Sequence, residues 1–498
     1  MIPSIAIVGG GVAGWMAAAA LANVFEGRGA IKLVELANEP PAGLAEGTLP
    51  SIRAFHDQLG IDEDELVRTT GATFSLGSAF ADWRGQGGGF FHPFGPYGSS
   101  IETVGFHHAW LRQHQRGEGG DFEAYSLAAV AASLGRFARP SADPSSVLSS
   151  FSYGLHLDVA RYADHLRQLA AGLGVVGLHP KFASVDLRSS DGFIDALALE
   201  DGQRVRADLF IDCTDQARLI GQAMGVGWQD WSSWLGCDRV VSVSTESAGE
   251  MPPFTRLQAR PAGWLARTPL QDRAANRFVY CSQAIGDDAA TQVLLESLPR
   301  QATSPPQMQR FTSGRRDLFW ARNCVALGSA AGALDPLAST RLALIQSALT
   351  RLIPLLPGGA VEPADLQEYN RLAIAEHESL RDFLILHYCA SGRGDGPPWV
   401  GTRAIPDTLA SRIELFLARA RVAPLAAETF QAPDWLAVLF GLQVQPRRYH
   451  PFADGLDLAD LRGRLLALRT VVRQAADSMP SHAAFIARAL RGAPAPVS

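Results

Sequence analysis

The first 36 residues alternate between apolar runs typical of strands and a run typical of a helix. Residues 4–8 (SIAIV) form a short β-branched run, glycines follow at 9–11, and residues 12–25 form an alanine-rich stretch without strand-like alternation. A second apolar run, AIKLVEL, covers residues 30–36. Strand, glycine turn, helix and strand in this order predict a βαβ unit at the start of a parallel sheet.

Further strands are expected in the middle of the chain, because β-branched or alternating runs lie there between Gly, Asp and Pro turns. They are the runs GFIDALALE, RVRADLFIDCT, DRVVSVST and NRFVYCS. Beyond about Leu349 the pattern turns helical almost throughout. We therefore expect an α/β protein with a Rossmann-like sheet, an interleaved mixed or antiparallel sheet and a C-terminal helical cap, divided into residues 1–350 and 351–498.

Composition narrows the possible partners. The 498 residues are 47% hydrophobic and 19% charged, with a net charge of -6, so no basic field is present to collect nucleic acid. No apolar run approaches the roughly 18 residues of a membrane helix, and the N-terminus lacks the pattern of a signal peptide. The five cysteines show neither CxxC nor Cys/His ligand spacing, which predicts no zinc site and no disulfide framework. We expect a cytoplasmic protein without membrane, metal or nucleic-acid contacts.

The glycines after the first run form GxGxxG between a predicted strand and helix, and an acid closes the second strand. In dinucleotide sites such glycines allow a tight turn and close approach to a pyrophosphate, the helix N-terminus attracts the phosphates, and the acid accepts from a ribose hydroxyl. The alternative is a glycine turn in a crowded core. The predicted contacts are Gly9, Gly11, Val12, Ala13, Gly14 and Glu35.

A late segment, NCVALGSAAGALDPL, favours FAD over a nicotinamide. A strand at 325–327 leads into small residues at 328–332, and a helix is expected after Pro336, so that backbone amides could face the phosphates and ribityl chain of FAD. Close packing of helices is the competing explanation of the small residues. The predicted cofactor contacts in this segment are Gly328, Ser329, Asp335 and Pro336.

These motifs and several others resemble the flavin-dependent tryptophan halogenases nearly end to end. The resemblance rests on GGGVAGWMAA, AEGTLPSIRAFHDQLGIDEDEL, GATFSLGSAFADW, FFHPFG, WLGCDRVVSV, WLARTPLQDR, GSAAGALDPLASTRLALIQSAL and PRRYHPFADGLDLADLR. It implies bound FAD, reduced by a separate flavin reductase, a flavin hydroperoxide that oxidises halide, and a small aromatic substrate. It also implies that residues 46–50, with Glu46, Gly47 and Thr48, form a strap over the flavin, and that His92 and Phe94 lie beside the substrate.

The sequence departs from the family where the halogenating residues are expected. Ser75 stands in place of the family's catalytic lysine, and Ala338 in place of its catalytic glutamate. Arg341 replaces a small residue near the halide position, and Ala266 replaces the second tryptophan of the WxWxIP motif. A serine hydroxyl cannot carry an oxidised halogen as an amine can, and the only lysines are Lys32 and Lys181.

Three functions remain open on these residues. The first is an FAD-dependent monooxygenase that uses the flavin hydroperoxide directly. In it His92 is a base, a hydrogen-bond donor or a stacking residue, and Arg341 is an anion or carboxylate anchor or a solvated or ion-paired residue at a helix start. The second is a flavin-binding scaffold or regulatory protein without catalysis, and the third is a residual halogenase. A nicotinamide dehydrogenase would leave the late glycine segment unexplained.

Overall fold

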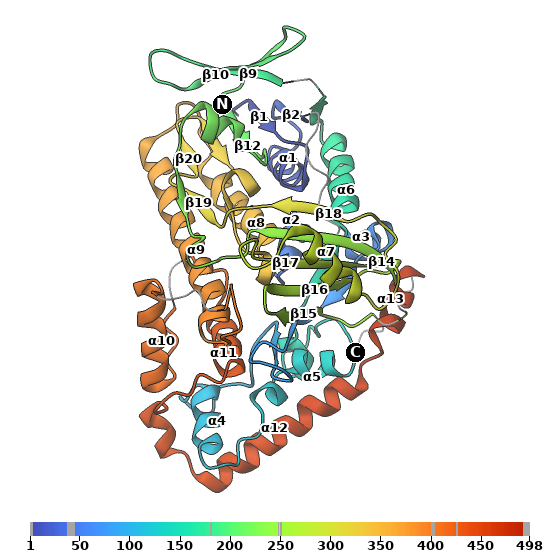
Figure 1. The fold of residues 1–498 in the computed structure, drawn as a ribbon, viewed down its shortest axis with the longest axis vertical. Coiled ribbons are helices and arrows are strands. Elements are labelled where there is room, and N and C mark those ends of the chain that lie inside the picture. The colour runs from blue at the N-terminus through green and yellow to red at the C-terminus, as the bar shows by residue number, and fades with distance from the viewer. Residues whose placement is uncertain are drawn as a thin grey trace. The chain divides into compact units, whose positions relative to one another are not determined.

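The computed structural model describes residues 3–36, 45–179, 182–247, 249, 251–399, 404–424 and 427–491 (Figure 1). The chain forms two compact units, each built from three separate stretches. Unit 1 comprises Met1–Thr70, Leu157–Asp238 and Arg310–Ser379, and unit 2 comprises Gly71–His156, Arg239–Gln309 and Leu380–Ser498. The two-part division at residue 350 stays a prediction; that position lies inside a helix of unit 1.

A six-stranded sheet of order β20-β21-β12-β1-β2-β8 forms the centre of unit 1. All of its pairings are parallel except that of β20 with β21. The strands are β1 (Ile5–Val8), β2 (Ile31–Val34), β8 (Val176–Leu178), β12 (Leu209–Asp212), β20 (Trp320–Ala321) and β21 (Cys324–Ala326). Residues of β1 and β12 are buried throughout, as expected of central parallel strands covered on both faces. The predicted βαβ start of a parallel sheet is confirmed.

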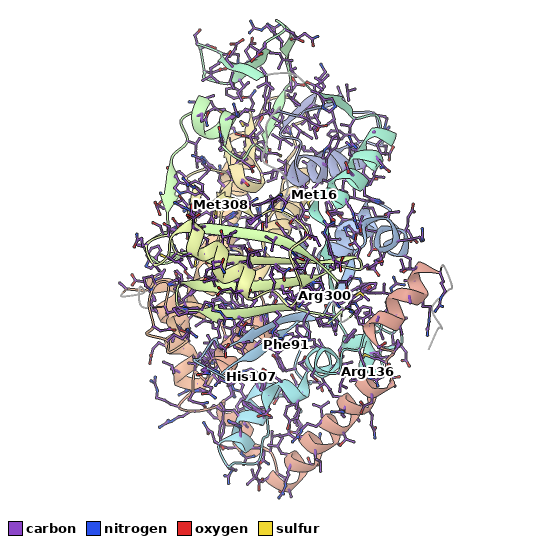
Figure 2. The ribbon with its side chains drawn as sticks, turned by 45° about the vertical axis from the view of Figure 1, so that its right-hand side comes forward. Met16, Phe91, His107, Arg136, Arg300 and Met308 are labelled. Carbon is purple, nitrogen blue, oxygen red and sulfur yellow. The ribbon has the colours of Figure 1, made fainter. Side chains whose placement is uncertain are left out.

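Helix α1 (Val12–Val24) follows β1 and is buried from Val12 to Ala22. A helix that is apolar all round needs cover on every side, and α6 (Val159–Gly172) and α8 (Arg341–Leu352) supply part of it. Met16, labelled in Figure 2, has no exposed surface. The alanine-rich sequence of α1 therefore allows neighbouring elements to approach its backbone closely.

The remaining elements of unit 1 are small. The other helices that lie wholly in it are α2 (Ile52–Gln58), α3 (Glu63–Thr70), η3 (Arg218–Ala223), η4 (Gly328–Ala330), η5 (Pro336–Ala338) and η6 (Ile353–Leu355). The other strands are β3 (Glu46–Gly47), β9 (Phe182–Leu187), β10 (Ile194–Leu199), β11 (Arg204–Val205), β13 (Trp228–Asp230), β19 (Gly314–Arg316) and β22 (Gly332–Ala333). The run RVRADLFIDCT, which suggested one strand, contains two: β11 pairs with β10, whereas β12 belongs to the large sheet.

Unit 2 contains the interleaved sheet that the mid-chain pattern predicts. Its order is β18-β14-β17-β16-β15-β5-β6, and β15 and β5 pair in parallel. The strands are β5 (Gly77–Ala81), β6 (Phe90–Pro93), β14 (Arg239–Glu246), β15 (Thr255–Arg260), β16 (Gly263–Pro269), β17 (Arg273–Tyr280) and β18 (Gln307–Arg310). Strands β4 (Thr73–Ser75) and β7 (Gly154–Leu157) pair separately, antiparallel.

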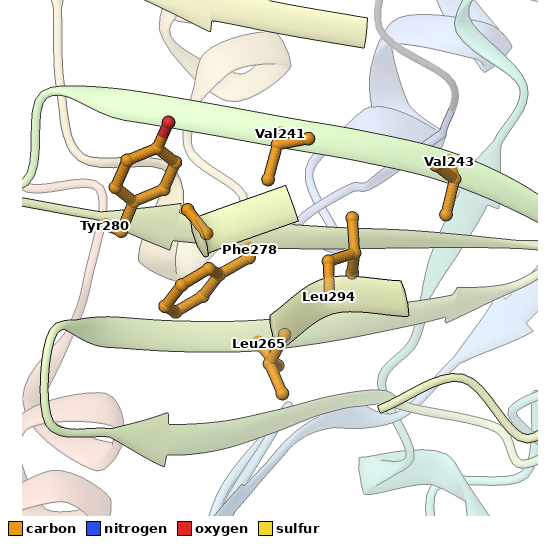
Figure 3. Packing of buried hydrophobic residues seen from close by; sticks show 7 residues of the cluster. Val241, Val243, Leu265, Phe278, Tyr280 and Leu294 are labelled. Carbon is orange, nitrogen blue, oxygen red and sulfur yellow. The ribbon is translucent and has the colours of Figure 1, made fainter. Parts of the chain in front are cut away.

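Helix α7 (Asp287–Glu296) packs on one face of this sheet, against β14 and β17. Leu294 of α7 packs with Val241 and Val243 of β14 and with Phe278 of β17 in one buried cluster (Figure 3). Alternate residues along a strand point to the same face, so the spacing of Val241 and Val243 places both valines under α7. The run DRVVSVST was expected to form a strand, and it does so as β14.

All regular elements described after Ala333 are helical. The long ones are α8, α9 (Pro363–Cys389), α10 (Asp407–Arg419), α11 (Ala432–Gly441), α12 (Leu458–Ser478) and α13 (His482–Leu490), with η7 (Pro451–Gly455) between α11 and α12. Earlier in unit 2 lie α4 (Phe106–His114), η1 (Phe122–Tyr125), α5 (Leu127–Ser133) and η2 (Val147–Ser150). The predicted α/β class with a helical C-terminal part is confirmed. No helix in the described ranges combines the length and the apolar character needed to cross a membrane.

Candidate functional site

In the glycine turn after β1, other backbone atoms lie too close to Gly9 and Gly14 for a side chain to fit. Gly9 has φ +117°, and a Cβ there would lie 2.7 Å from the carbonyl oxygen of Cys213. A Cβ on Gly14 would lie 2.0 Å from the carbonyl oxygen of Gly9, so the helix packs directly against the turn. A Cβ on Gly11 would meet nothing within 4 Å. Gly9 and Gly14 are therefore required by the fold itself, whereas Gly11 borders open space.

That open space lies at the N-terminus of α1. Gly11 is the N-cap residue and offers no side-chain hydrogen bond to the first turn, in which Val12 and Ala13 follow. The first amides of a helix have no partner within it and carry the positive end of the helix dipole. This end of α1 is therefore a suitable place for a phosphate group.

Glu35, the acid predicted to contact a ribose, follows β2 directly. Its amide donates to the carbonyl oxygen of Leu178 at 2.8 Å. A Cβ on Gly10 would lie 2.8 Å from Oε2 of Glu35, so the carboxylate lies against the glycine turn. Its Oε1 is buried, accepts no hydrogen bond from the described residues and lies 3.6 Å from Nδ1 of His179. An acid next to the turn with a spare acceptor fits a ribose hydroxyl.

The late glycine segment, residues 328–332, packs against the N-terminal turn of α1. Gly328, two residues after β21, has φ +60°, and a Cβ there would lie 2.9 Å from Cβ of Ala13 in α1. Ser329 lies in the short helix η4 and is half-buried. More than 300 residues separate Ala13 from Gly328 in the sequence, yet small residues at both positions let the two backbones meet. The cradle of glycines fits the phosphate and ribityl portions of a dinucleotide such as FAD.

The helix expected directly after Pro336 begins later. Residues Pro336–Ala338 form the 3-10 turn η5, Ser339 adopts the left-handed conformation with φ 56°, and α8 begins at Arg341. Asp335, the N-cap residue of η5, has no exposed surface. Proline fixes φ at a helical value but does not ensure that a helix continues. Ala338 is the last residue of η5 and is 8% exposed.

Asp212, at the end of β12, holds the neighbouring loop together. Its carboxylate accepts hydrogen bonds from the amide and hydroxyl of Thr214 and from the amides of Leu219 and Ile220, at 2.7–3.0 Å. Burial raises the pKa of Asp212, and these hydrogen bonds act in the opposite direction. The mid-chain strand is thus the direct parallel neighbour of β1, and its terminal acid stabilises the turn into η3.

Arg341 and the predicted strap meet within unit 1. Nη1 of Arg341 donates to Oε1 of Glu46 in β3 at 2.9 Å. Glu46 is mostly buried, with 13% of its side chain exposed, and Arg341 is 43% exposed. Gly47 and Thr48 follow in the strap and are both buried. Of the two roles open for Arg341, the ion-paired residue at a helix start is the one that the contacts support.

Ser75, at the position of the expected lysine, ends strand β4 in unit 2. It is 2% exposed, and its hydroxyl donates to the carbonyl oxygen of Gly77 at 3.4 Å, a long hydrogen bond. The preceding Phe74 packs in an aromatic cluster with Phe137, Tyr153 and Phe485. The hydroxyl therefore lies in a buried region, next to a residue packed among aromatic rings. Lys32 is exposed on β2 of unit 1, and Lys181 lies outside the described residues.

His92 of β6 has a partner that the sequence did not suggest. Its Nε2 lies 3.0 Å from Oδ1 of Asp434, near the start of α11. The other carboxylate oxygen of Asp434 accepts from the amide of Gln431 at 2.8 Å and so caps the same helix. The His92 ring packs near Phe383 and Phe430, with both pairs of ring centroids 5.8 Å apart. No local motif joins residues 92 and 434, so only the fold could reveal this pair.

Two further positions of unit 2 belong to the predicted substrate side. Phe94 is 8% exposed, and its amide donates to the carbonyl oxygen of Leu76 at 2.8 Å. Trp264 of β16 is fully buried and donates from its indole to the hydroxyl of Tyr388 at 2.9 Å, while Ala266 is buried two residues later. The predicted cofactor residues, Ala338 and Arg341 all belong to unit 1; Ser75, His92 and Phe94 belong to unit 2. Among the residues with a described placement, no group of three or more His, Cys, Asp or Glu could hold a metal ion.

Comparisons with known proteins give one consistent result. The sequence model of the family described as tryptophan halogenase matches residues 4–457. Tryptophan 7-halogenase RebH of Lentzea aerocolonigenes is 30% identical over 84% of this chain and 82% of its own. Tryptophan 6-halogenase SttH of Streptomyces toxytricini is 29% identical over 97% of both chains.

Solved structures agree with the sequence matches. BrvH, a flavin-dependent halogenase from Brevundimonas sp. BAL3, is 40% identical, with a TM-score of 0.93 over 98% of this chain and 99% of that chain. Xcc4156, a flavin-dependent halogenase from Xanthomonas campestris, is 41% identical, with a TM-score of 0.94 over 100% of both chains. The glycine cradle of unit 1 and these full-length similarities lead to the same conclusion: this chain belongs to the tryptophan halogenase family.

Proposed function

We propose that this protein binds FAD in unit 1 and oxidises a small aromatic substrate by inserting oxygen rather than halogen. The observation that carries this proposal is the buried Ser75 hydroxyl, bonded to Gly77, at the position where the family resemblance predicts an amine. A hydroxyl forms no chloramine, and Ala338 offers no carboxylate to assist halogen transfer.

The residues of unit 1 would hold the cofactor through backbone contacts. The amides at the start of α1 would bind the pyrophosphate, and Glu35 would accept from the adenosine ribose. The late segment, from Gly328 through Ser329 to Asp335 and Pro336, would pass along the ribityl end, and the strap residues Glu46, Gly47 and Thr48 would border the flavin ring. When bound, reduced FAD supplies the two electrons that activate dioxygen. Oxygenation then balances with one oxygen atom in the product and the other in water.

The substrate side of the proposal rests on His92 and Phe94 in unit 2. Since Nε2 of His92 faces the carboxylate of Asp434, this nitrogen carries the proton when the ring is neutral, and Nδ1 keeps its lone pair. Such an imidazole can accept a proton from a phenol or an indole N–H, and Asp434 stabilises the positive charge that results. Phe94 would supply an apolar face for the aromatic ring.

Two further parts of the proposal concern supply and location. The reduced flavin would come from a separate flavin reductase. We place the reaction in the cytoplasm, where thiols stay reduced; in the described part of the chain no disulfide joins any of the five cysteines, at residues 213, 237, 281, 324 and 389.

The experiment uses purified protein loaded with FAD and reduced anaerobically. It is mixed with oxygen and a panel of indoles and phenols, with and without bromide, and the products are read by mass spectrometry. We expect products heavier by one oxygen atom and no dependence on bromide. Hydrogen peroxide as the only product would contradict oxygenation and favour the flavin-binding scaffold.

Halogenation remains a second candidate because of one observation. Two flavin-dependent halogenases match this chain at 40 and 41% identity over almost its full length. Under this alternative, brominated products appear with bromide in the same experiment, recognised by the paired bromine isotopes. Oxygen insertion and bromination are thus separated in one measurement.

A further inference from the structure

Two polar contacts connect the strap to helix α8 in unit 1. The first is the ion pair between Arg341 and Glu46 at 2.9 Å. The second is a pair of hydrogen bonds: Nε2 of Gln346 donates to the carbonyl oxygen of Ser51 at 2.7 Å, and the Ser51 hydroxyl donates to Oε1 of Gln346 at 3.2 Å. These contacts lie at the two ends of residues 46–51. The segment is therefore attached to α8 both where it begins and where it ends.

The spacing of the two contacts explains the course of the strap. Five helical residues separate Arg341 from Gln346, a rise of about 7.5 Å. Ser51 follows Glu46 by five positions, which would span about 17 Å if the chain were fully extended. The extra length is taken up by the long Arg341 side chain and by a turn at Pro50, where the amide of Arg53 donates to the carbonyl oxygen of Pro50. The chain between the contacts must therefore bend away from a straight line.

The position of Arg341 supports a role beyond helix stability. It is the first residue of α8, and the first turn of this helix contains no acid. A cation there is opposed by the positive end of the helix dipole. Glu46 supplies the negative charge that the helix lacks, and it comes from the strap. The ion pair therefore offsets the unfavourable position of Arg341 in the helix dipole, and it links the start of α8 to Glu46.

We infer that Arg341 and Gln346 are positioning residues that fix the strap at both ends and hold Glu46–Pro50 in one conformation at the flavin site. The significance of the strap for the flavin rests on the proposed function, whereas its attachment to α8 does not. Arg341 then acts through Glu46, and it replaces the small residue that the family resemblance predicts. Loss of the ion pair should free the start of the strap while the Gln346 contacts keep its end in place.

Hydrogen–deuterium exchange of the ligand-free protein tests the attachment. We expect the peptide that covers residues 45–53 to exchange about 2–5-fold faster in Arg341→Gln and in Glu46→Gln, the range expected for loss of a partly exposed ion pair. Arg341→Lys should restore at least half of the protection. High salt should bring the wild type toward the variants, because the Debye length falls to about 3 Å at 1 M. The matched control is Arg371→Gln, which removes an exposed ion pair with Glu368 in the same unit.

Flavin binding gives the second measurement. With FAD as the probe, we expect Arg341→Gln to weaken binding about 3–10-fold and Arg371→Gln to leave it unchanged. Unchanged exchange of the 45–53 peptide in both Arg341→Gln and Glu46→Gln would overturn the inference. If the wild type bound no FAD, the proposed function would fail, while the exchange data would still decide the attachment of the strap.

Discussion

Nε2 of His92 and Oδ1 of Asp434 lie 3.0 Å apart, and Asp434 also caps the helix on which it lies. One carboxylate therefore fixes the ring of His92 and the start of α11 together. The histidine belongs to a sheet strand and the acid to a helix 342 residues later. The geometry of the proposed substrate side consequently depends on the packing between these two elements of unit 2.

Replacing Asp434 with Asn should reduce stability without affecting FAD affinity. The amide keeps part of the cap but loses the charge-assisted hydrogen bond to His92, a loss of about 1.5–3 kcal/mol in unfolding free energy. Denaturation in urea measures the first effect and flavin titration the second. Asp460→Asn, which removes an exposed ion pair with Arg464, is the control and should change stability by less than about 0.5 kcal/mol. Equal losses in both variants would contradict a special role of the His92 contact.

Substitution of Gly11 should affect FAD binding but not stability. We expect the free energy of unfolding of Gly11→Ala to lie within about 0.5 kcal/mol of the wild-type value, because its new methyl group meets nothing within 4 Å. The same methyl group would occupy the proposed phosphate space, so FAD affinity should fall at least about tenfold. Gly172→Ala in α6, also without a neighbour within 4 Å, is the control and should bind FAD normally. Normal FAD binding by Gly11→Ala would place the cofactor elsewhere.

Gly14→Ala should behave differently from Gly11→Ala. Its methyl group would lie 2.0 Å from the carbonyl oxygen of Gly9, so α1 must move away from the turn. Overpacking of this kind costs about 1–3 kcal/mol or more. We expect a lower thermal midpoint together with lost flavin binding, measured by circular dichroism and flavin titration. A variant as stable as the wild type would show that the turn can relax.

Restoring the two missing groups should restore halogenation if only these groups were lost. The double variant Ser75→Lys with Ala338→Glu is expected to form brominated indole from reduced FAD, oxygen and bromide, measured by mass spectrometry. The single variant Ala338→Glu still lacks an amine and should form none. Both positions are buried, so thermal stability must be recorded alongside. A stable, flavin-bound double variant without product would mean that further residues prevent halogenation.

Stability should decrease as the solution is made acidic, partly through His482. Nδ1 of His482 lies 2.7 Å from the carbonyl oxygen of Met251, and its Nε2 accepts from the amide of Phe74 at 3.1 Å. Both nitrogens of the neutral ring therefore have a hydrogen-bond partner. Burial lowers the pKa of His482 to about 4. Because the unfolded chain binds this proton near pH 6.5, stability is present above that pH and is lost as the pH falls toward 4, by about 3 kcal/mol in total.

His482→Gln tests this linkage. The glutamine keeps a donor and an acceptor but does not titrate. Between pH 6.5 and 4 the slope of unfolding free energy against pH should therefore decrease by about 1.4 kcal/mol per pH unit, the contribution of one proton. Urea denaturation at several pH values gives the slope. The matched control is His114→Gln, at a half-buried histidine in the last turn of α4 that stacks on Trp110; its slope should stay close to that of the wild type. An unchanged slope in His482→Gln would mean that other groups account for the acid sensitivity.

Local patterns predicted the fold well, and long-range side-chain pairs escaped prediction. The βαβ start was correct because strand, turn and helix lie within one stretch of about 35 residues, and Gly9, Gly14 and Glu35 have recognisable spacings. The split of RVRADLFIDCT into two strands was missed because each half contains a β-branched residue and only sheet pairing distinguishes them. The delayed start of α8 was missed because the left-handed turn at Ser339 has no sequence signal as strong as glycine.

Contacts such as Arg341 with Glu46 follow from the folded backbone alone, since 295 residues separate the pair. The same holds for Asp434, whose sequence neighbours indicate only a helix start. Sequence could identify Arg341 as unusual and allow an ion pair, yet it could not name the partner.

The strand order of unit 1 has a consequence for synthesis of the chain. Strand β12 lies between β1 and β21, so the first strand made belongs to a sheet whose later member, Cys324–Ala326, leaves the ribosome more than 300 residues afterwards. At roughly 5–20 residues per second, that delay is on the order of tens of seconds. A nascent chain must therefore keep its N-terminal apolar segments from aggregating during this interval. Truncated genes that end before residue 324 should yield insoluble product, even though they encode the entire glycine motif.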